Sequence, residues 1–452
     1  MAKYKAYPEY KDSGVEWLGK VPSHWEILSA KRMFQSVRTP AYKSDEQLAA
    51  SQKYGVIPQS LMMQLNDSKV MLALKGTESF RHVEANNFVI SLRSFEGGIE
   101  YSQYTGCVSP AYTVLKNSKP ISYGYYRYLL KCMPFIAALQ SSTDSLRDGK
   151  SINYEQFSAL SLPLSSVQEQ NVIAAFLDHE TTKIDNLIEK QQQLIELLKE
   201  KRQAVISHAV TKGLNPDVPM KDSDVEWLGK VPEHWAVMPV KYVCALIKDG
   251  THLPPPRVED GIPLLSVRNI IGGVFQFRAD DSQISHKDYK SLCSSFIPKK
   301  DDVLLAIVGA TLGKVALVPE MDSFHIQRSL GIFRTKKLIH PQHLSYIFES
   351  KDFQNLLWEN AGFSAQPGIY LGTLSNFCVP VPPVTEQLKI SEFITATVDK
   401  LDHLITQASQ LIGLIQERRT ALISAAVTGK IDVRDWVAPD TQDVEEPQEA
   451  IA

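Results

Sequence analysis

The sequence predicts an α+β protein in which two globular mixed α/β domains are joined by two long helices. These helices are expected to form an antiparallel coiled coil with pseudo-two-fold symmetry. Two duplications predict this arrangement. Residues 169–211 align without a gap on residues 386–428, and residues 11–25 match residues 221–235 at 13 of 15 positions. The blocks between these repeats share almost no sequence.

The longer repeat predicts the two helices. Neither copy contains proline, and apolar residues recur at intervals of three and four, which favours a helix that buries one stripe against another helix. A helix of this length spans roughly 65 Å at about 1.5 Å per residue. Such a helix needs a partner of similar length, and the second copy supplies one. The predicted contact positions are Ile184, Leu187, Leu194, Leu198, Leu401, Leu404, Leu411 and Ile415.

The shorter repeat predicts an anchor segment that precedes each variable block. In its first copy Trp17, Leu18, Val21 and Trp25 are the apolar anchors, and a packing role is the simplest interpretation. The chain order is anchor, block, helix, anchor, block, helix. Closing this order into a ring requires antiparallel helices and predicts that residues 11–25 lie near Lys430.

These patterns divide the chain into seven segments. They are an N-terminal anchor, a first domain, a central spacer helix region, a repeated anchor, a second domain, a C-terminal spacer helix region and an acidic, disordered tail. The predicted bounds, in that order, are residues 1–25, 26–162, 163–220, 221–235, 236–381, 382–433 and 434–452.

Composition limits the classes of function. The 452 residues are 44% hydrophobic, which is ordinary for a globular protein, and contain no apolar run of membrane-spanning length. The N-terminus lacks the apolar core of a signal peptide, and the five cysteines form no Cys-x-x-Cys pair. We therefore expect a cytoplasmic protein without a membrane partner. The net charge is only −3, and the acidic tail contributes to it. The chain therefore has no large overall excess of positive charge, so any nucleic-acid contact must come from local patches.

Each variable block combines short β-like runs with polar turns. Arg and Lys suit guanine, Asn and Gln suit adenine, and hydroxyl groups and backbone amides suit phosphates. Each of these residues taken alone is more simply an exposed loop residue, but the set recurs on two comparable frames. The candidate DNA-binding residues are Lys75, Thr77, Arg81, Arg93, Ser94, Arg147, Lys150, Thr251, His252, Arg268, Asn269, Thr311, Lys314, Gln327 and Arg328.

Catalytic motifs are missing from the sequence. The run from Gly309 to Val315 has too few residues between its glycines for a phosphate-binding loop, so a plain turn is the better interpretation. His340 and His343 do not have zinc-protease spacing. No Gly-x-Ser-x-Gly or Gly-x-Gly-x-x-Gly motif occurs. We expect no catalytic residue, no metal site and no cofactor bound by this chain.

The order of anchors, blocks and helices resembles the DNA-specificity subunit of type I restriction-modification enzymes. The strings that carry the resemblance are GVEWLGKVPSHW, NFVISLRSFEGG with VSPAY, KDGTHLPPP, GIPLLSVRNI, DDVLLAIVGATLGKV, VPPVTEQLKISEFI and RRTALISAAVTGKI. Together they cover about residues 10–433 and leave out only the tail.

This resemblance implies that the two domains are target-recognition domains, each reading one half of a split, asymmetric site on double-stranded DNA. It implies that the helices set the spacing and dock two methyltransferase subunits, with restriction (motor) subunits joining the complex. S-adenosylmethionine, ATP and Mg would then be bound by these partners.

Two other interpretations stay open at this point. The chain could be a coiled-coil scaffold with two protein-binding domains and no DNA readout, for which the repeated helices suffice. It could also be a stand-alone DNA methyltransferase or nuclease, against which the missing cofactor motifs count.

Overall fold

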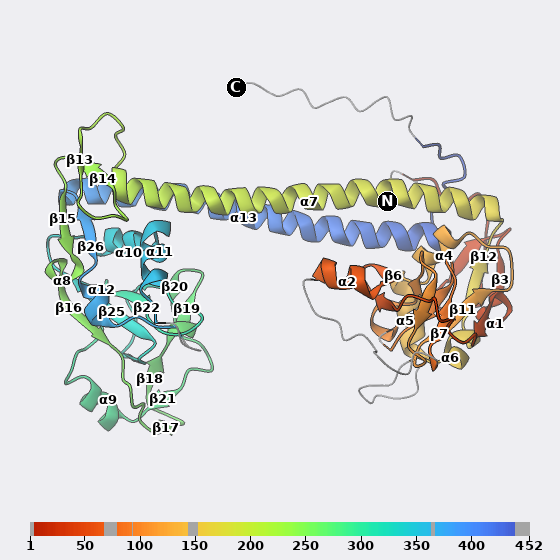
Figure 1. Ribbon diagram of the computed structural model, residues 1–452, viewed down its shortest axis with the longest axis horizontal. Coiled ribbons are helices and arrows are strands. Elements are labelled where there is room, and N and C mark those ends of the chain that lie inside the picture. The colour runs from red at the N-terminus through yellow and green to blue at the C-terminus, as the bar shows by residue number, and fades with distance from the viewer. Residues whose placement is uncertain (1–3, 67–78, 93, 143–151, 363–366, 439–452) are drawn as a thin grey trace. The chain divides into compact units, whose positions relative to one another are not determined.

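The computed structural model describes residues 4–66, 79–92, 94–142, 152–362 and 367–438. These residues form two compact units, which are described separately (Figure 1). Unit 1 combines Met1–Gln191 with Gln410–Ala452, and unit 2 is Gln192–Ser409. Two long helices, α7 (Val167–Lys212) and α13 (Val384–Val427), each contribute to both units, which confirms the predicted helices.

The strands and helices of unit 1 pack against the first part of α7 and the last part of α13. Its described strands are β1 (Tyr10–Asp12), β2 (Lys20–Pro22), β3 (Glu26–Ser29), β4 (Phe34–Val37), β5 (Leu48–Ser51), β6 (Gly55–Pro58), β7 (Arg81–Val83), β8 (Phe88–Ile90), β9 (Glu100–Tyr101), β10 (Gly106–Val108), β11 (Thr113–Asn117) and β12 (Ser161–Leu164). The shorter helices are α1 (Ala30–Met33), α2 (Gln59–Asn66), α3 (Ser94–Gly97), α4 (Tyr123–Leu129), α5 (Met133–Ser141) and α6 (Tyr154–Ala159).

Unit 2 has the same kinds of element with larger insertions. Its described strands are β13 (Met220–Asp222), β14 (Lys230–Pro232), β15 (Ala236–Pro239), β16 (Cys244–Asp249), β17 (Arg257–Val258), β18 (Ile262–Leu265), β19 (Ile270–Ile271), β20 (Val274–Phe275), β21 (Gln283–Ile284), β22 (Val303–Ala306), β23 (Val315–Leu317), β24 (His325–Ile326), β25 (Leu330–Thr335) and β26 (Cys378–Val381). Its helices are α8 (Val240–Val243), the 3-10 turn η2 (Val267–Asn269), α9 (His286–Leu292), α10 (Pro341–Glu349), α11 (Lys351–Glu359) and α12 (Leu371–Ser375).

The main sheets of the two units share one strand order. Unit 1 has the order β4-β11-β8-β9, and unit 2 has β16-β25-β22-β23 followed by β20 and β19. β8 pairs antiparallel with β11, and β22 pairs antiparallel with β25. The β-like runs recognised in the sequence form these central strands. The two blocks, which share almost no sequence, therefore have a common order of strands in their main sheets.

The two anchor segments pack as predicted. Leu18, Val21 and Trp25 are buried in unit 1, and their counterparts Leu228, Val231 and Trp235 are buried in unit 2. In unit 1 the Lys430 ammonium donates to the carbonyl oxygen of Leu18 at 2.9 Å. This contact confirms that residues 11–25 lie near Lys430. In unit 2 the Lys212 ammonium donates in the same way to the carbonyl of Leu228 at 2.9 Å.

The segments of α7 and α13 run antiparallel within each unit. In unit 1 Arg419 Nε lies 2.8 Å from Asp185 Oδ1, and the end of α13 lies near the start of α7. In unit 2 Arg202 Nε lies 3.1 Å from Asp402 Oδ1. Because Asp185 and Arg202 align with Asp402 and Arg419 in the repeat, the two ion pairs are two copies of one contact.

Half of the predicted helix contact positions are wrong. Ile184, Leu198, Leu401 and Ile415 are buried or half-buried, but Leu187, Leu194, Leu404 and Leu411 are 41–46% exposed. The isoleucines that follow those leucines occupy the contact stripe instead: Ile188, Ile195, Ile405 and Ile412. Each Leu-Ile pair satisfies the periodicity equally well at either position, so the sequence alone cannot choose between neighbours. The displaced leucines form an exposed stripe beside the contact.

Helix α10 carries a fully buried histidine, His343. Both ring nitrogens of His343 are buried without a hydrogen-bond partner among the described residues. Burial lowers the pKa of His343 to about 3, and the nearby His340 adds to the effect. The folded chain therefore holds this imidazole neutral over the range in which the unfolded chain protonates it.

We predict that Ile405→Ala lowers the free energy of unfolding by about 1–2 kcal/mol, because it removes half-buried contact. The adjacent Leu404→Ala should change it by no more than about 0.5 kcal/mol, as for other surface substitutions. Thermal unfolding followed by circular dichroism measures both variants. An equal or larger loss for Leu404→Ala would contradict the assigned contact stripe.

We also predict a pH dependence from His343. Its folded pKa lies below the unfolded value, so its contribution to stability is complete above about pH 6.5 and falls as the pH drops toward 3. The loss between pH 6.5 and 5 should be about 2 kcal/mol. The variant His343→Leu should lose less stability over that range than the wild type, whereas His286→Leu, at an exposed position, should not differ from it. Equal pH dependence in all three proteins would show that His343 does not titrate in this way.

Candidate nucleic-acid interface

Four of the predicted residues meet at one end of the main sheet in unit 2. Thr251 follows β16 and forms a β-bridge with Gln327, and the Arg328 amide donates to the Thr251 carbonyl at 3.1 Å. His252 lies beside Thr251 with its Nε2 2.6 Å from Asp249 Oδ2. We call Asp249, Thr251, His252, Gln327 and Arg328 the strand-end face of unit 2.

Glycine makes this face possible. A Cβ at Gly250 would lie 2.2 Å from the carbonyl oxygen of Ile326, so only glycine allows the two chain segments to approach so closely. The close approach places the end of β16 beside the segment that precedes β25. Polar side chains from two distant parts of the sequence are thereby presented together.

A hollow of about 450 Å³ opens at the strand-end face of unit 2. Its walls are apolar at Ile307 and Val308, and its rim carries Asp249, Arg328 and Tyr370. Arg328 is exposed, and Tyr370 is 85% exposed. Tyr370, two residues after Gly368, was not among the residues predicted from the sequence. An exposed aromatic ring next to an arginine suits contact with a base or a sugar.

The corresponding end of the sheet in unit 1 carries two arginines. Pro40, two residues after Arg38, forms a β-bridge with Arg81, and the Arg81 guanidinium donates to the Tyr112 carbonyl at 2.5 Å. Burial lowers the pKa of Arg81, and the charge of Arg38 lowers it further. Within the described residues, neither arginine forms an ion pair with a carboxylate. Two neighbouring arginines without counter-charges attract the negative charge of DNA and carry the donors that suit guanine.

We call Arg38, Arg81 and Tyr112 the strand-end face of unit 1. Arg38 was not predicted, because a single arginine at the end of a β-like run has no distinguishing pattern in the sequence. Its proximity to Arg81 is visible only in the structure.

Two of the predicted DNA-binding residues, Ser94 and Asn269, are buried. Ser94 is 1% exposed, and its hydroxyl accepts from the Ser91 amide at 2.7 Å. Asn269 is fully buried, accepts from the Ser266 amide at 3.0 Å and donates to Asp281 at 2.9 Å. Both side chains hold local turns together, so their polar atoms do not face a ligand.

Three further residues lie apart from the strand-end faces. Arg268 is held by Asp280 at 3.1 Å, within the η2 turn region. Thr311 and Lys314 lie between β22 and β23, where the run that begins at Gly309 forms the predicted turn before β23 starts at Val315. Lys314 borders a separate hollow near α7. The predicted residues Lys75, Thr77, Arg93, Arg147 and Lys150 fall outside the described residues.

The described residues contain no group of three or more His, Cys, Asp or Glu side chains placed to hold a metal ion. Over the same part of the chain, no helix has the length and apolar character needed to cross a membrane. Each unit therefore has one polar strand-end face at the same end of its main sheet. Each face carries at least one exposed or half-buried arginine.

The fold thus defines a class of protein in which one frame occurs twice, with different polar residues on each copy. The model of the family described as type I restriction modification DNA specificity domain matches residues 22–198 and again residues 232–412. The chain belongs to this family.

Individual relatives agree with that assignment. The chain is 24% identical over 429 residues to the type I restriction enzyme MjaVIII specificity subunit of Methanocaldococcus jannaschii, covering 92% of this chain and 95% of the relative. It is 24% identical over 330 residues to the EcoBI specificity subunit of Escherichia coli, covering 69% and 67% of the two chains.

Two solved structures share the fold. One comes from work on complex assembly and conformational transition of the type I R-M system, with a TM-score of 0.68, 12% identity and coverage of 91% of this chain and 99% of that one. The other is the HsdS subunit from Thermoanaerobacter tengcongensis, with a TM-score of 0.52, 13% identity and coverage of 91% and 98%.

Proposed function

We propose that this chain is the non-catalytic DNA-specificity subunit of a type I restriction-modification complex. Each strand-end face reads one half of a bipartite, asymmetric site on double-stranded DNA. The observation that carries the proposal is the contrast between a common sheet and different polar residues at the same end of it. Two copies of a domain that must read different sequences would keep the frame and change the residues that touch bases.

The proposal assigns α7 and α13 the role of a spacer. The ion pairs Asp185–Arg419 and Arg202–Asp402 support one continuous antiparallel coiled coil with a pseudo-two-fold axis, because each is the image of the other under the repeat. Such a rod holds the two readers at a fixed separation along the duplex. Half-sites read from one face of DNA are about 34 Å apart, and this is less than the length of either helix.

The exposed leucine stripe, extended by the exposed Leu197 and Leu414, supplies a docking surface for two methyltransferase subunits. Leu187, Leu194 and Leu197 are 43%, 42% and 62% exposed, and their repeat counterparts Leu404, Leu411 and Leu414 are 46%, 41% and 63% exposed. Exposed apolar residues in a row mark protein interfaces. Because the stripe occurs in two equivalent copies, it fits two copies of one partner.

The partners complete the chemistry. The methyltransferase subunits would bind S-adenosylmethionine, and restriction subunits with ATP and Mg would join through them. Near-neutral charge in this chain fits such a division, because the partners can supply much of the phosphate contact.

We predict that substitutions at the two faces act on different halves of the DNA site. Arg38→Ala should weaken base discrimination in one half of the site only, and Arg328→Ala in the other half only. Loss of one base contact should lower the discrimination against the wrong base roughly 5- to 150-fold. Methylome sequencing of cells that carry each variant complex measures this. Arg32→Ala, at an exposed arginine in α1 away from the face, is the matched control. Changes in both halves from one substitution would contradict the assignment of one face to one half.

We also predict that each leucine stripe holds one methyltransferase subunit. Leu197→Glu and Leu414→Glu should each reduce the complex from two methyltransferase subunits to one, since a charge in an apolar contact is costly. The double variant should bind none. Mass photometry of the purified complexes counts the subunits. Unchanged stoichiometry in the double variant would place the docking surface elsewhere.

A further inference from the structure

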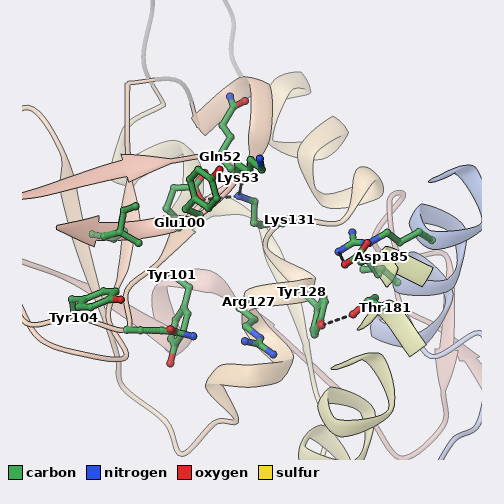
Figure 2. A pocket seen from close by; sticks show the side chains of 17 residues that line it. Gln52, Lys53, Glu100, Tyr101, Tyr104, Arg127, Tyr128, Lys131, Thr181 and Asp185 are labelled. Carbon is green, nitrogen blue, oxygen red and sulfur yellow. Dashed lines mark hydrogen bonds and ion pairs between the residues drawn. The ribbon is translucent and has the colours of Figure 1, made fainter. Parts of the chain in front are cut away.

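A hollow of about 800 Å³ in unit 1 lies between the first domain and the helix pair (Figure 2). Its walls come from the β5–β6 turn, from β9 and the loop after it, from α4, and from α7 and α13. This size falls within the range of small-ligand sites, about 300–1,000 Å³. We call it the tyrosine crevice and define it by Lys53, Glu100, Tyr101, Tyr104, Arg127 and Lys131.

The walls of the tyrosine crevice are fixed by backbone contact. Gly55 has a φ of +76°, and a Cβ there would lie 2.6 Å from the Tyr101 carbonyl oxygen. The β5–β6 turn therefore packs directly on β9. Across the crevice, the Tyr128 hydroxyl lies 2.6 Å from Asp178 Oδ1 and 3.1 Å from Thr181 Oγ1, which ties α4 to α7.

A buried carboxylate in the crevice lacks part of its hydrogen bonding. Glu100 is 1% exposed, and its Oε2 accepts from the Lys131 ammonium at 2.7 Å. Its Oε1 is buried and has no hydrogen-bond partner among the described residues. Burial raises the pKa of Glu100, and the Lys131 charge opposes the rise. An unpaired buried acceptor is unfavourable, so a ligand that donates a hydrogen bond to it gains affinity.

The crevice also offers an unused donor. Arg127 pairs through Nη2 with Asp178, but its Nε is buried without a partner among the described residues. A ligand that carries both a donor and an acceptor offers one partner to Glu100 and one to Arg127. The edge of a nucleobase has these groups.

Aromatic rings and a cation complete the chemistry. Tyr101 and Tyr104 lie on the same wall of the crevice (Figure 2), and Tyr104 is 38% exposed. Lys53 is exposed on the β5–β6 turn, 4.9 Å from the centroid of the Tyr54 ring. Tyrosines beside cations are the usual platform for stacked bases with attached phosphates.

The tyrosines of the crevice have no counterpart among the residues that line the matching hollow of unit 2. The counterpart hollow in unit 2 is bordered by Arg202, the repeat partner of Arg419, and by the start of β23. Its lining residues include Gly272, Gly273 and Lys314 but no tyrosine. The aromatic, partly unpaired crevice is thus specific to unit 1.

We propose that the tyrosine crevice binds a nucleobase with an attached phosphate. Tyr101 and Tyr104 stack on the base, Glu100 accepts from a ring or exocyclic N–H group, Arg127 donates to a base acceptor, and Lys53 neutralises the phosphate. The base comes either from an unstacked nucleotide of a DNA strand or from a free nucleotide. This site is separate from the strand-end faces and does not rest on the proposed function.

The test titrates the full-length chain with the four deoxynucleoside monophosphates and with ten-residue single-stranded oligonucleotides, by isothermal titration calorimetry. Tyr104→Ala should weaken binding roughly 5- to 100-fold, as for loss of one stacking contact. Glu100→Gln should weaken it while preserving side-chain shape. Tyr242→Ala is the matched control, because Tyr242 is 58% exposed and lies under Lys241 but is outside the crevice.

The outcomes separate the sources of the base. Binding of monophosphates indicates a free nucleotide, and binding of oligonucleotides alone indicates a DNA strand. No binding, or binding that Tyr104→Ala leaves unchanged, overturns the proposal. If Tyr104→Ala instead weakens only the binding of a methyltransferase subunit, the crevice is a protein-docking site and the proposal also fails. Methylome changes in the strand-end variants are independent of all these results.

Discussion

Each unit depends on the packing of one part of α7 against one part of α13. The core of unit 1 includes Phe176 from α7 and Val427 from α13, and the core of unit 2 includes Ile206 from α7 and Ile394 from α13. Neither domain therefore has a complete core without both helices. The helix starts are fastened in the same way, because Gln170 accepts from the Ser122 amide at 2.8 Å and Gln387 accepts from the His340 amide at 2.7 Å. This dependence makes the helices structural parts of the domains as well as the connection between them.

The two units share their scaffold but differ in their strand-end faces. The sheet order, the buried anchor segments and the Asp–Arg contact between the helices recur in both units. The strand-end faces differ, with paired arginines in unit 1 and an Asp–His–Arg group beside a hollow in unit 2. The proposed function would account for this division, because it gives the chain two identical partners and two different halves of a DNA site.

The sequence allowed the helices, the anchors and the central strands to be predicted, because each leaves a periodic or repeated pattern. It could not distinguish Leu404 from Ile405 as the contact residue, since adjacent apolar residues fit one periodicity equally well. It selected Asn269 by residue type alone, and the burial of that side chain depends on Asp281, twelve residues away. Arg38 and Tyr370 were missed because a binding face assembled from separate loops has no signature in the linear sequence. Long-range proximity, and not local propensity, determines which polar residues face outward.

The most direct test of the account lengthens the spacer. Seven residues inserted after Gln191, together with seven inserted after Ala408, preserve the phase of the helix contact and extend the rod by about 10 Å. Methylome sequencing of the resulting complex should show both half-sites unchanged and the unread gap longer by about three base pairs, since DNA rises about 3.4 Å per base pair. The same seven residues added after Trp436 should leave the gap unchanged. Altered half-sites with an unaltered gap would contradict the account.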